Sequence, residues 1–301
     1  MRATTARVVL AAAAALVLST VVTQAQARSG KPAWRIALTS NREGDSEIYT
    51  MYSDGTGVRR LTHTPKFDAP GPLSPDGRKV LFYSQRSPGG DVWVMNADGS
   101  RQRNLTRNAA HDGGGTWSPD GRTIAFGTNR DGNDELYVMN ADGTGQRNLA
   151  PNPSSQEGVG GWTPDGRRFL FTTDRDGNWE IYAMDADGSN PRNLTRHSGN
   201  DGGIPGVSGI VWSPAGRKVA FASTRDTRAE SDSEIYVMNV DGSGLRRLTK
   251  APGVDAPISW SPDGRKLAFA RWPVTPRWAF YVMNIDGSGV RKVNWSLAGK
   301  S

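Results

Sequence analysis

Two phrases recur along the chain, and their spacing restricts the fold more than any other feature. The first is Ser-Pro-Asp-Gly, which begins at Ser74, Ser118 and Ser261 and is varied at Thr163 and Ser213. The second has the form Glu-Ile-Tyr-Val-Met-Asn-x-Asp-Gly and begins at Glu47, Asp91, Glu135, Glu180, Glu234 and, in altered form, Ala279. A repeat period of roughly 40–50 residues with four short strands in each unit indicates a propeller.

The unit between residues 112 and 149 shows how each repeat divides into four strands, A to D. We predict strand A over 112–117, B over 123–128, C over 135–140 and D over 147–149. Segments rich in Pro, Gly, Asn and Asp separate them and are typical of tight turns. Strands B and C are apolar on both faces, as expected for a sheet that packs between two neighbouring sheets.

The first 27 residues have the pattern of an export signal. Arg2 and Arg7 precede an apolar run over residues 8–22, and Ala25-Gln26-Ala27 supplies a small-x-small cleavage pattern. An uncleaved membrane anchor is the alternative, but the run is rich in Ala and short for a membrane span. We predict cleavage after Ala27, a periplasmic or secreted protein, and no stable membrane insertion after cleavage.

The remaining chain is predicted to be all-β: a six-bladed β-propeller of four-stranded antiparallel blades that forms a single domain over residues 28–301. Its repeats begin near residues 34, 74, 118, 163, 213 and 261. By register, strand A of blade 1 would end near Ser29, which places it across the predicted cleavage site. We therefore expect blade 1 to be incomplete, or to be completed by the uncut segment or by a partner strand.

Composition excludes several classes of site. The 301 residues contain no Cys and only 3 His, so a disulfide framework, a thiolate zinc site and a cysteine nucleophile are excluded. The formal net charge of +7 is mild and evenly spread, which does not favour a nucleic-acid partner. We expect no cofactor, no metal and a monomer.

The phrases Trp-Ser-Pro-Asp-Gly and Glu-Ile-Tyr-Val-Met-Asn-Ala-Asp-Gly resemble the WD-like repeats of TolB-type six-bladed propellers. The resemblance covers about residues 34 to 294, and the repetition of both phrases makes it specific. It implies a periplasmic propeller that binds protein partners through one face and its central channel.

Loop lengths predict which face carries the function. The A–B and C–D turns keep constant spacing, whereas the D–A crossing between Leu194 and Pro214 and the B–C hairpin between Phe221 and Tyr236 are lengthened. The sixth B–C hairpin, over 271–278, has a sequence unlike that of the other hairpins. D–A crossings and B–C hairpins emerge on the same face of a propeller. Because varied loops on a rigid scaffold often bind ligands, we predict that this face binds the partner; neutral drift of surface loops is the alternative.

The same face is predicted to carry a ring of carboxylates. The ring comprises Asp68, Asp112, Glu157 and Asp255, each seven residues before the Pro of its A–B turn, and Asp201, which matches from the strand D side of its lengthened crossing. They could receive an ammonium group, an arginine or a metal ion. The alternative is that each acid pairs with an arginine that follows strand B; the candidates are Arg42, Arg86, Arg130, Arg175 and Arg225.

Three tryptophans complete the candidate site. Trp179, Trp272 and Trp278 lie in B–C hairpins with no repeat to explain them, and Trp is enriched at binding hot spots. The predicted function is that of an exported, non-enzymatic scaffold that binds a protein or peptide through the face of D–A crossings and B–C hairpins. Two alternatives stay open: a saccharide or small-molecule hydrolase or lyase that uses the carboxylates, and a structural envelope protein that binds glycan.

Overall fold

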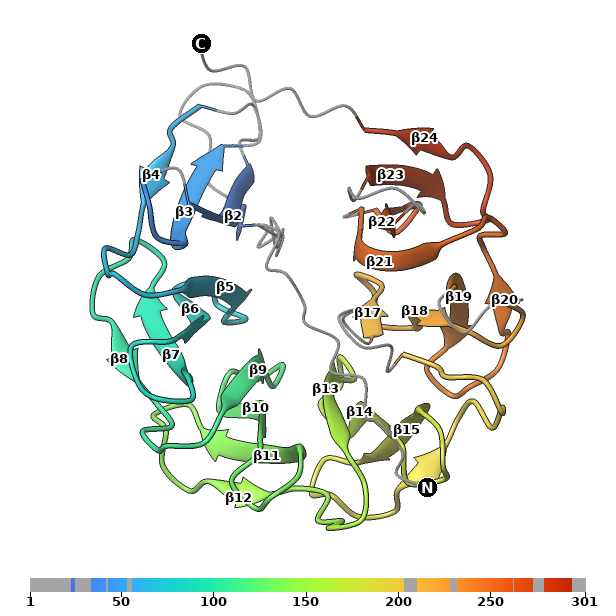
Figure 1. The fold of residues 1–301 in the computed structure, drawn as a ribbon, viewed down its shortest axis with the longest axis horizontal. Helices are drawn as coiled ribbons and strands as arrows, with labels where there is room; N and C mark the ends of the chain where they lie inside the picture. The colour runs from blue at the N-terminus through green and yellow to red at the C-terminus, as the bar shows by residue number, and fades with distance from the viewer. Residues whose placement is uncertain are drawn as a thin grey trace, which may run out of the picture.

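The computed structural model describes residues 23–24, 34–41, 43–52, 56–202, 210–227, 232–261, 263–272 and 279–293. These residues form six four-stranded antiparallel sheets arranged as the blades of a ring (Figure 1). The predicted fold class is therefore confirmed. Within the described ranges, no helix is long and apolar enough to cross a membrane.

The blades follow the chain in order, and each uses four consecutive strands. Blades 1 and 2 consist of β1 (Thr23–Gln24), β2 (Trp34–Ser40), β3 (Glu47–Tyr52), β4 (Arg59–Arg60), β5 (Asp68–Leu73), β6 (Lys79–Ser84), β7 (Asp91–Asn96) and β8 (Arg103–Asn104). Blades 3 and 4 consist of β9 (Asp112–Trp117), β10 (Thr123–Thr128), β11 (Glu135–Asn140), β12 (Arg147–Asn148), β13 (Glu157–Trp162), β14 (Arg168–Thr173), β15 (Glu180–Asp185) and β16 (Arg192–Asn193). Blades 5 and 6 consist of β17 (Ile210–Trp212), β18 (Lys218–Ser223), β19 (Glu234–Asn239), β20 (Arg246–Arg247), β21 (Val254–Trp260), β22 (Lys266–Trp272), β23 (Ala279–Asn284) and β24 (Arg291–Lys292).

Backbone hydrogen bonds define two faces of the ring. On one, the start of each inner strand bonds to the preceding blade's B–C hairpin, as in Asp112 N to Gly90 O (3.0 Å) and Asp201 N to Trp179 O (2.7 Å). We call this the hairpin face. On the opposite face the A–B and C–D turns meet, and we call it the turn face. The D–A crossings and B–C hairpins therefore share one face, as the repeat predicted.

The apolar core is divided among the interfaces between blades. One cluster lies between blades 2 and 3 and includes Leu81, Ile124 and Phe126, and similar clusters join blade 1 to 2, 3 to 4, 4 to 5 and 5 to 6. Blade 6 differs on the side that faces blade 1. Phe280 and Val282 of β23 are half-buried, whereas Ile235 and Val237, at the same positions in blade 5, are buried.

The strand that would cover this side of blade 6 is the inner strand of blade 1. That strand is β1, which has only two residues and pairs Thr23 with Arg35 and Gln24 with Trp34. It lies inside the predicted signal peptide. Cleavage after Ala27 would leave blade 1 with the three strands β2 to β4, in agreement with the expectation that this blade is incomplete. Residues 295–301 lie outside the described residues.

Equivalent positions in blades 3 and 6 should therefore differ in their effect on stability. We expect Leu136→Ala, at a side chain with no exposure, to lower the free energy of unfolding by about 2–5 kcal/mol. Phe280→Ala removes a larger side chain but should cost only about 1–2 kcal/mol, because Phe280 is half-buried. Urea denaturation of both variants measures the difference. An equal or larger loss for Phe280→Ala would show that blade 6 is fully covered.

Candidate binding face

The five predicted ring acids lie at the hairpin face, at the inner ends of blades 2 to 6. None of their side chains is exposed, and each pairs with an arginine of its own blade. The pairs are Asp68 with Arg86 (2.7 Å), Asp112 with Arg130 (3.2 Å), Glu157 with Arg175 (3.1 Å), Asp201 with Arg225, and Asp255 with Arg271 (2.6 Å). Four of the five acids thus have arginine partners that the alternative interpretation proposed, and Asp255 pairs with a different arginine.

The arginine partners are fixed by aromatic rings as well as by carboxylates. The Arg130 guanidinium carbon lies 4.8 Å from the centre of the Tyr137 ring, and Arg86 lies at the same distance from Trp93. In blade 6 the partner is Arg271, which the sequence analysis did not name, and Arg42 lies outside the described residues. A cation held between a carboxylate and a ring has little freedom, so these pairs order the hairpin face.

A second set of carboxylates lies beside the first, and we did not predict it. It comprises the first residues of strand C in blades 1 to 5, all of them buried: Glu47, Asp91, Glu135, Glu180 and Glu234. Thr64 connects the two sets in one interface, because its N–H donates to Glu47 and its hydroxyl donates to Asp68. The signal was present in the sequence, since an acid recurs at the first position of strand C in blades 1 to 5.

Charge compensation of this second set differs between blades. In blades 1 and 5, strand D supplies Arg60 to Glu47 (2.8 Å) and Arg247 to Glu234 (2.8 Å). In blades 2, 3 and 4 the same position holds Asn104, Asn148 and Asn193. Within the described residues, Asp91, Glu135 and Glu180 accept hydrogen bonds from neutral groups only. The interfaces 2–3, 3–4 and 4–5 therefore each contain two acids and one guanidinium.

The interface between blades 3 and 4 shows the consequence. Glu157 lies within hydrogen-bonding reach of Glu135, and burial together with that neighbouring carboxylate raises the pKa of Glu157 to about 8. One oxygen of each carboxylate is buried and accepts no hydrogen bond. Two ionised carboxylates have no proton to donate, so a proton on Glu157 supplies the missing donor.

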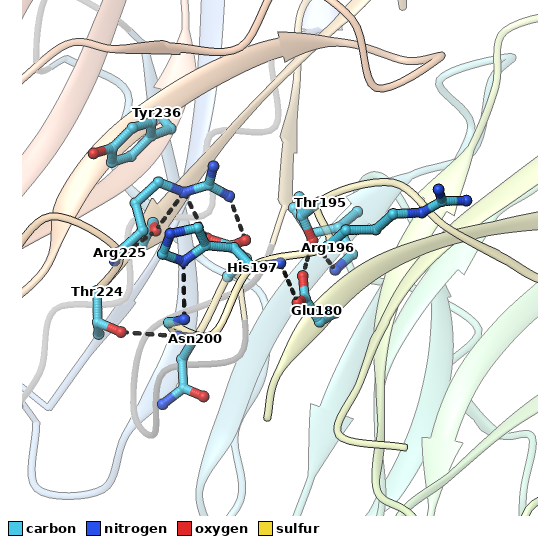
Figure 2. A network of polar contacts seen from close by, with 12 residues as sticks. Glu180, Thr195, Arg196, His197, Asn200, Thr224, Arg225 and Tyr236 are labelled. Atoms are coloured by element: carbon cyan, nitrogen blue, oxygen red, sulfur yellow. Dashed lines mark hydrogen bonds and ion pairs between the residues drawn. The ribbon is translucent and has the colours of Figure 1, made fainter. Parts of the chain in front are cut away.

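The interface between blades 4 and 5 has the same composition (Figure 2). Glu180 accepts hydrogen bonds from the Thr195 hydroxyl and from the His197 N–H (2.6 Å), while Arg225 pairs with Asp201. Burial is the main cause that raises the pKa of Glu180, and the charge of Asp201 adds to it. Neutral donors thus hold this carboxylate in place without neutralising its charge.

The predicted tryptophans are only partly described. Trp179 is half-buried, and its backbone N–H donates to Asn200 Oδ1 (3.1 Å). Trp272 is half-buried at the end of β22, opposite Val254. Trp278 lies outside the described residues, as do residues 203–209, 228–231 and 273–278 of the varied loops.

Exposed charges on the hairpin face are also mainly negative. Among the described residues, the exposed acids are Glu43, Asp45, Asp131, Asp134, Asp176 and Asp226, and the exposed cations are Lys66, Arg107, Arg196 and Lys250. Together with Asp91 and Glu180, the buried acids of blades 2 and 4 that have no cationic partner among the described residues, they give the hairpin face an excess of negative charge.

The architecture and the sequence repeats define a TolB-type propeller. A family model described as "TolB beta propeller domain" matches residues 102–208 and 202–301, and the chain belongs to this family. A "Protein TolB homolog" of Chlorobium chlorochromatii is 44% identical over 57 residues, which are 18% of this chain and 13% of that protein. The chain therefore matches only a small part of that relative's length.

Solved structures extend the comparison. A putative TolB from Agrobacterium tumefaciens is 28% identical with a TM-score of 0.64, covering 78% of this chain and 83% of that one. TolB from Acinetobacter baumannii is 21% identical with a TM-score of 0.67, covering 84% and 61%. An oligogalacturonate lyase in complex with manganese shares the fold at 14% identity and a TM-score of 0.63, covering 86% and 73%. The described part of this chain has no group of three or more His, Asp or Glu that could hold a metal.

The carboxylates Glu135 and Glu157 predict a pH-dependent stability. Because the folded-state pKa of Glu157 is raised above its ordinary 4.5, the protonated form favours folding. The stability that the raised pKa of Glu157 contributes to the folded state is complete below pH 4.5 and is lost as the pH rises toward 8. Glu135→Gln removes the like charge and offers an amide donor to Glu157. Between about pH 5 and 8, the free energy of unfolding of this variant should fall by about 1–2 kcal/mol less than that of the wild type, as measured by urea denaturation.

The matched control is Glu47→Gln. Glu47 occupies the same position in blade 1 but pairs with Arg60, so its replacement should lower stability at both pH values, by about 1–3 kcal/mol. Equal pH dependence of the wild type and Glu135→Gln would contradict the shared-proton interpretation.

The ring acids themselves give a further prediction. Asp112→Asn and Asp255→Asn each leave a guanidinium without its buried carboxylate, so both should lower the free energy of unfolding by about 2–4 kcal/mol. A rise in melting temperature would instead indicate that repulsion between the acids is the larger effect.

Proposed function

We propose that the protein is an exported, non-enzymatic scaffold that binds a protein or peptide partner through the hairpin face. The excess of carboxylates over cations among the described residues of that face is the observation that carries the proposal. Membership of the TolB propeller family and similarity to solved TolB structures support the same class of function. Export is supported by the signal-like pattern over residues 1–27, with cleavage after Ala27.

The charge distribution indicates what kind of partner would bind. Blades 2 and 4 carry the surplus of buried carboxylate charge, and the exposed Asp131, Asp134 and Asp176 project from the hairpins of blades 3 and 4. A segment rich in Lys or Arg would gain favourable long-range electrostatic energy there, chiefly through faster association. We therefore infer that the partner presents a basic segment to this face.

Apolar anchoring is assigned to three tryptophans of the same face. Trp179, Trp272 and Trp278 belong to hairpins of blades 4 and 6, where the loops depart from the repeat. A partly exposed indole provides a large contact area with few rotatable bonds, which suits a binding hot spot. In this arrangement the acids attract the partner and the tryptophans hold it.

The enzymatic alternative is less well supported. A raised pKa such as that of Glu157 suits a general acid, but Glu157 is 3% exposed and its side chain is held by Ser155, Thr173 and Arg175. A substrate on the hairpin face would meet the exposed hairpin residues before it met any of the ring acids.

Two sets of charge variants test the proposal. The mature chain would be immobilised and exposed to envelope extract, with bound proteins identified and their affinities then titrated. Asp131→Asn/Asp134→Asn/Asp176→Asn should weaken binding about tenfold or more and reduce its dependence on salt. The control Asp142→Asn/Asp187→Asn/Asp241→Asn changes the same number of charges on the turn face and should leave the affinity unchanged. Equal loss in both variants, or in neither, would overturn the assignment of the face.

The tryptophans have a separate test. Trp272→Ala and Trp278→Ala should each weaken partner binding by about 1–2 kcal/mol with little change in melting temperature. Trp117→Ala is the control, because Trp117 is buried between blades 2 and 3 and its loss should lower stability. If Trp272→Ala and Trp278→Ala both left partner binding unchanged, these indoles would have a role in packing only.

A further inference from the structure

Three large apolar side chains stand out on the turn face. Val58, Leu245 and Val290 are 45%, 40% and 45% exposed, and they are the exposed large hydrophobics of the described chain. All three occupy the same position of the repeat, directly before the outer strand of a blade: Val58 before β4, Leu245 before β20 and Val290 before β24. Chance would not place every such side chain at a single repeat position.

Blades 2 and 3 fill this position with a glutamine that bonds to the preceding blade, and blade 4 has Pro191 there. Gln102 Nε2 donates to Leu61 O (3.0 Å), and Gln146 Nε2 donates to Leu105 O (3.1 Å). A glutamine therefore satisfies a neighbouring carbonyl, which Val and Leu cannot do. The apolar residues of the three blades are not explained by packing within the ring.

The blades that carry them are consecutive around the ring. β20 belongs to blade 5, β24 to blade 6 and β4 to blade 1, so the three positions follow one another along one sector of the rim (Figure 1). We call this sector the 5-6-1 rim. Exposed cations adjoin the apolar residues and line the neighbouring turns: Arg59, Arg217, Lys218, Arg246, Arg265, Lys266, Arg291 and Lys292.

Carboxylates on this rim only partly offset the cations. Asp241, Asp263 and Asp286 accept hydrogen bonds from serine hydroxyls of their own turns, which lower their pKa values and keep them charged. In blade 5 the A–B turn has Ala215 where the other described turns have Asp76, Asp120, Asp165 and Asp263. The rim thus combines a net positive charge with apolar tips.

We propose that the 5-6-1 rim docks the protein on the surface of a bilayer that contains anionic lipids. The apolar tips enter the boundary between headgroups and acyl chains, and the cations contact the lipid phosphates. Neither signal suffices alone, but a few partly inserted apolar side chains and a basic cluster together give reversible peripheral binding. A soluble polyanion such as a nucleic acid would use the cations but would leave the apolar tips without a role.

Docking in this way would turn the hairpin face away from the membrane, because the rim belongs to the opposite face. The inference does not rest on the proposed partner binding, since it uses none of the hairpin-face residues. Membrane binding and partner binding can accordingly succeed or fail separately.

Vesicle co-sedimentation with the mature full-length chain tests the proposal. The vesicles would contain phosphatidylcholine alone or phosphatidylcholine with phosphatidylglycerol. We expect binding to the anionic vesicles only, with loss at about 0.5 M salt. Val58→Gln/Leu245→Gln/Val290→Gln introduces the residue that blades 2 and 3 already use, and it should lower the partition coefficient on the order of tenfold. Arg265→Gln/Arg291→Gln/Lys292→Gln should lower it on the order of a hundredfold.

The matched control removes three cations from blades 2 and 3 of the same face. Arg78→Gln/Arg101→Gln/Arg122→Gln should change the partition coefficient by less than about threefold, and circular dichroism should show that all variants stay folded. The proposal is overturned if the wild type does not bind anionic vesicles, if the apolar variant binds as well as the wild type, or if both cation variants lose binding equally. Salt-sensitive binding that duplex DNA abolishes, and that the apolar variant retains, would identify a general polyanion surface instead.

Discussion

Each blade is stabilised mainly by apolar side chains that it shares with the next blade. Strands B and C of one blade pack against strand A of the following blade, so the ring has five apolar clusters in place of one central core. This constraint explains why strands B and C are apolar on both faces. It also explains why the incomplete blade 1 leaves Phe280 and Val282 of blade 6 half-buried, since the strand that would cover them is reduced to β1.

Buried charged residues also lie at the interfaces between blades. Each of the five described junctions has a buried acid at the start of strand C and a second buried acid at the hairpin-face end of the next blade's inner segment. Burial of two carboxylates requires cations, hydrogen-bond donors or a proton. Blades 1 and 5 supply a second arginine, whereas the interface of Glu135 and Glu157 takes a proton. The surplus of negative charge at the hairpin face is therefore a consequence of how the interfaces are neutralised.

The two faces of the ring differ for a related reason. The A–B and C–D turns use aspartates to accept hydrogen bonds from their own serines and backbone, so these aspartates are structural. Arginines and lysines follow them at the start of the next strand, where they are exposed. Cations thus accumulate on the turn face and acids on the hairpin face. The two faces of the ring therefore differ in the sign of their excess charge, and we assign a different kind of partner to each face.

The sequence by itself determined the blade number, the strand order and the face on which each loop lies, because turn residues and apolar strands repeat with one period. It also identified the ring acids and most of their arginine partners by register. Only the tertiary structure showed that Arg271 pairs with Asp255, and that Glu135 meets Glu157 across a blade interface. The first pair uses a residue of a hairpin that departs from the repeat, and the second joins two repeats, so neither contact follows from the spacing of residues along the chain. The exposure of Val58, Leu245 and Val290 was likewise decided by the ring, since an apolar residue in a turn is covered or exposed according to what the neighbouring blade places over it.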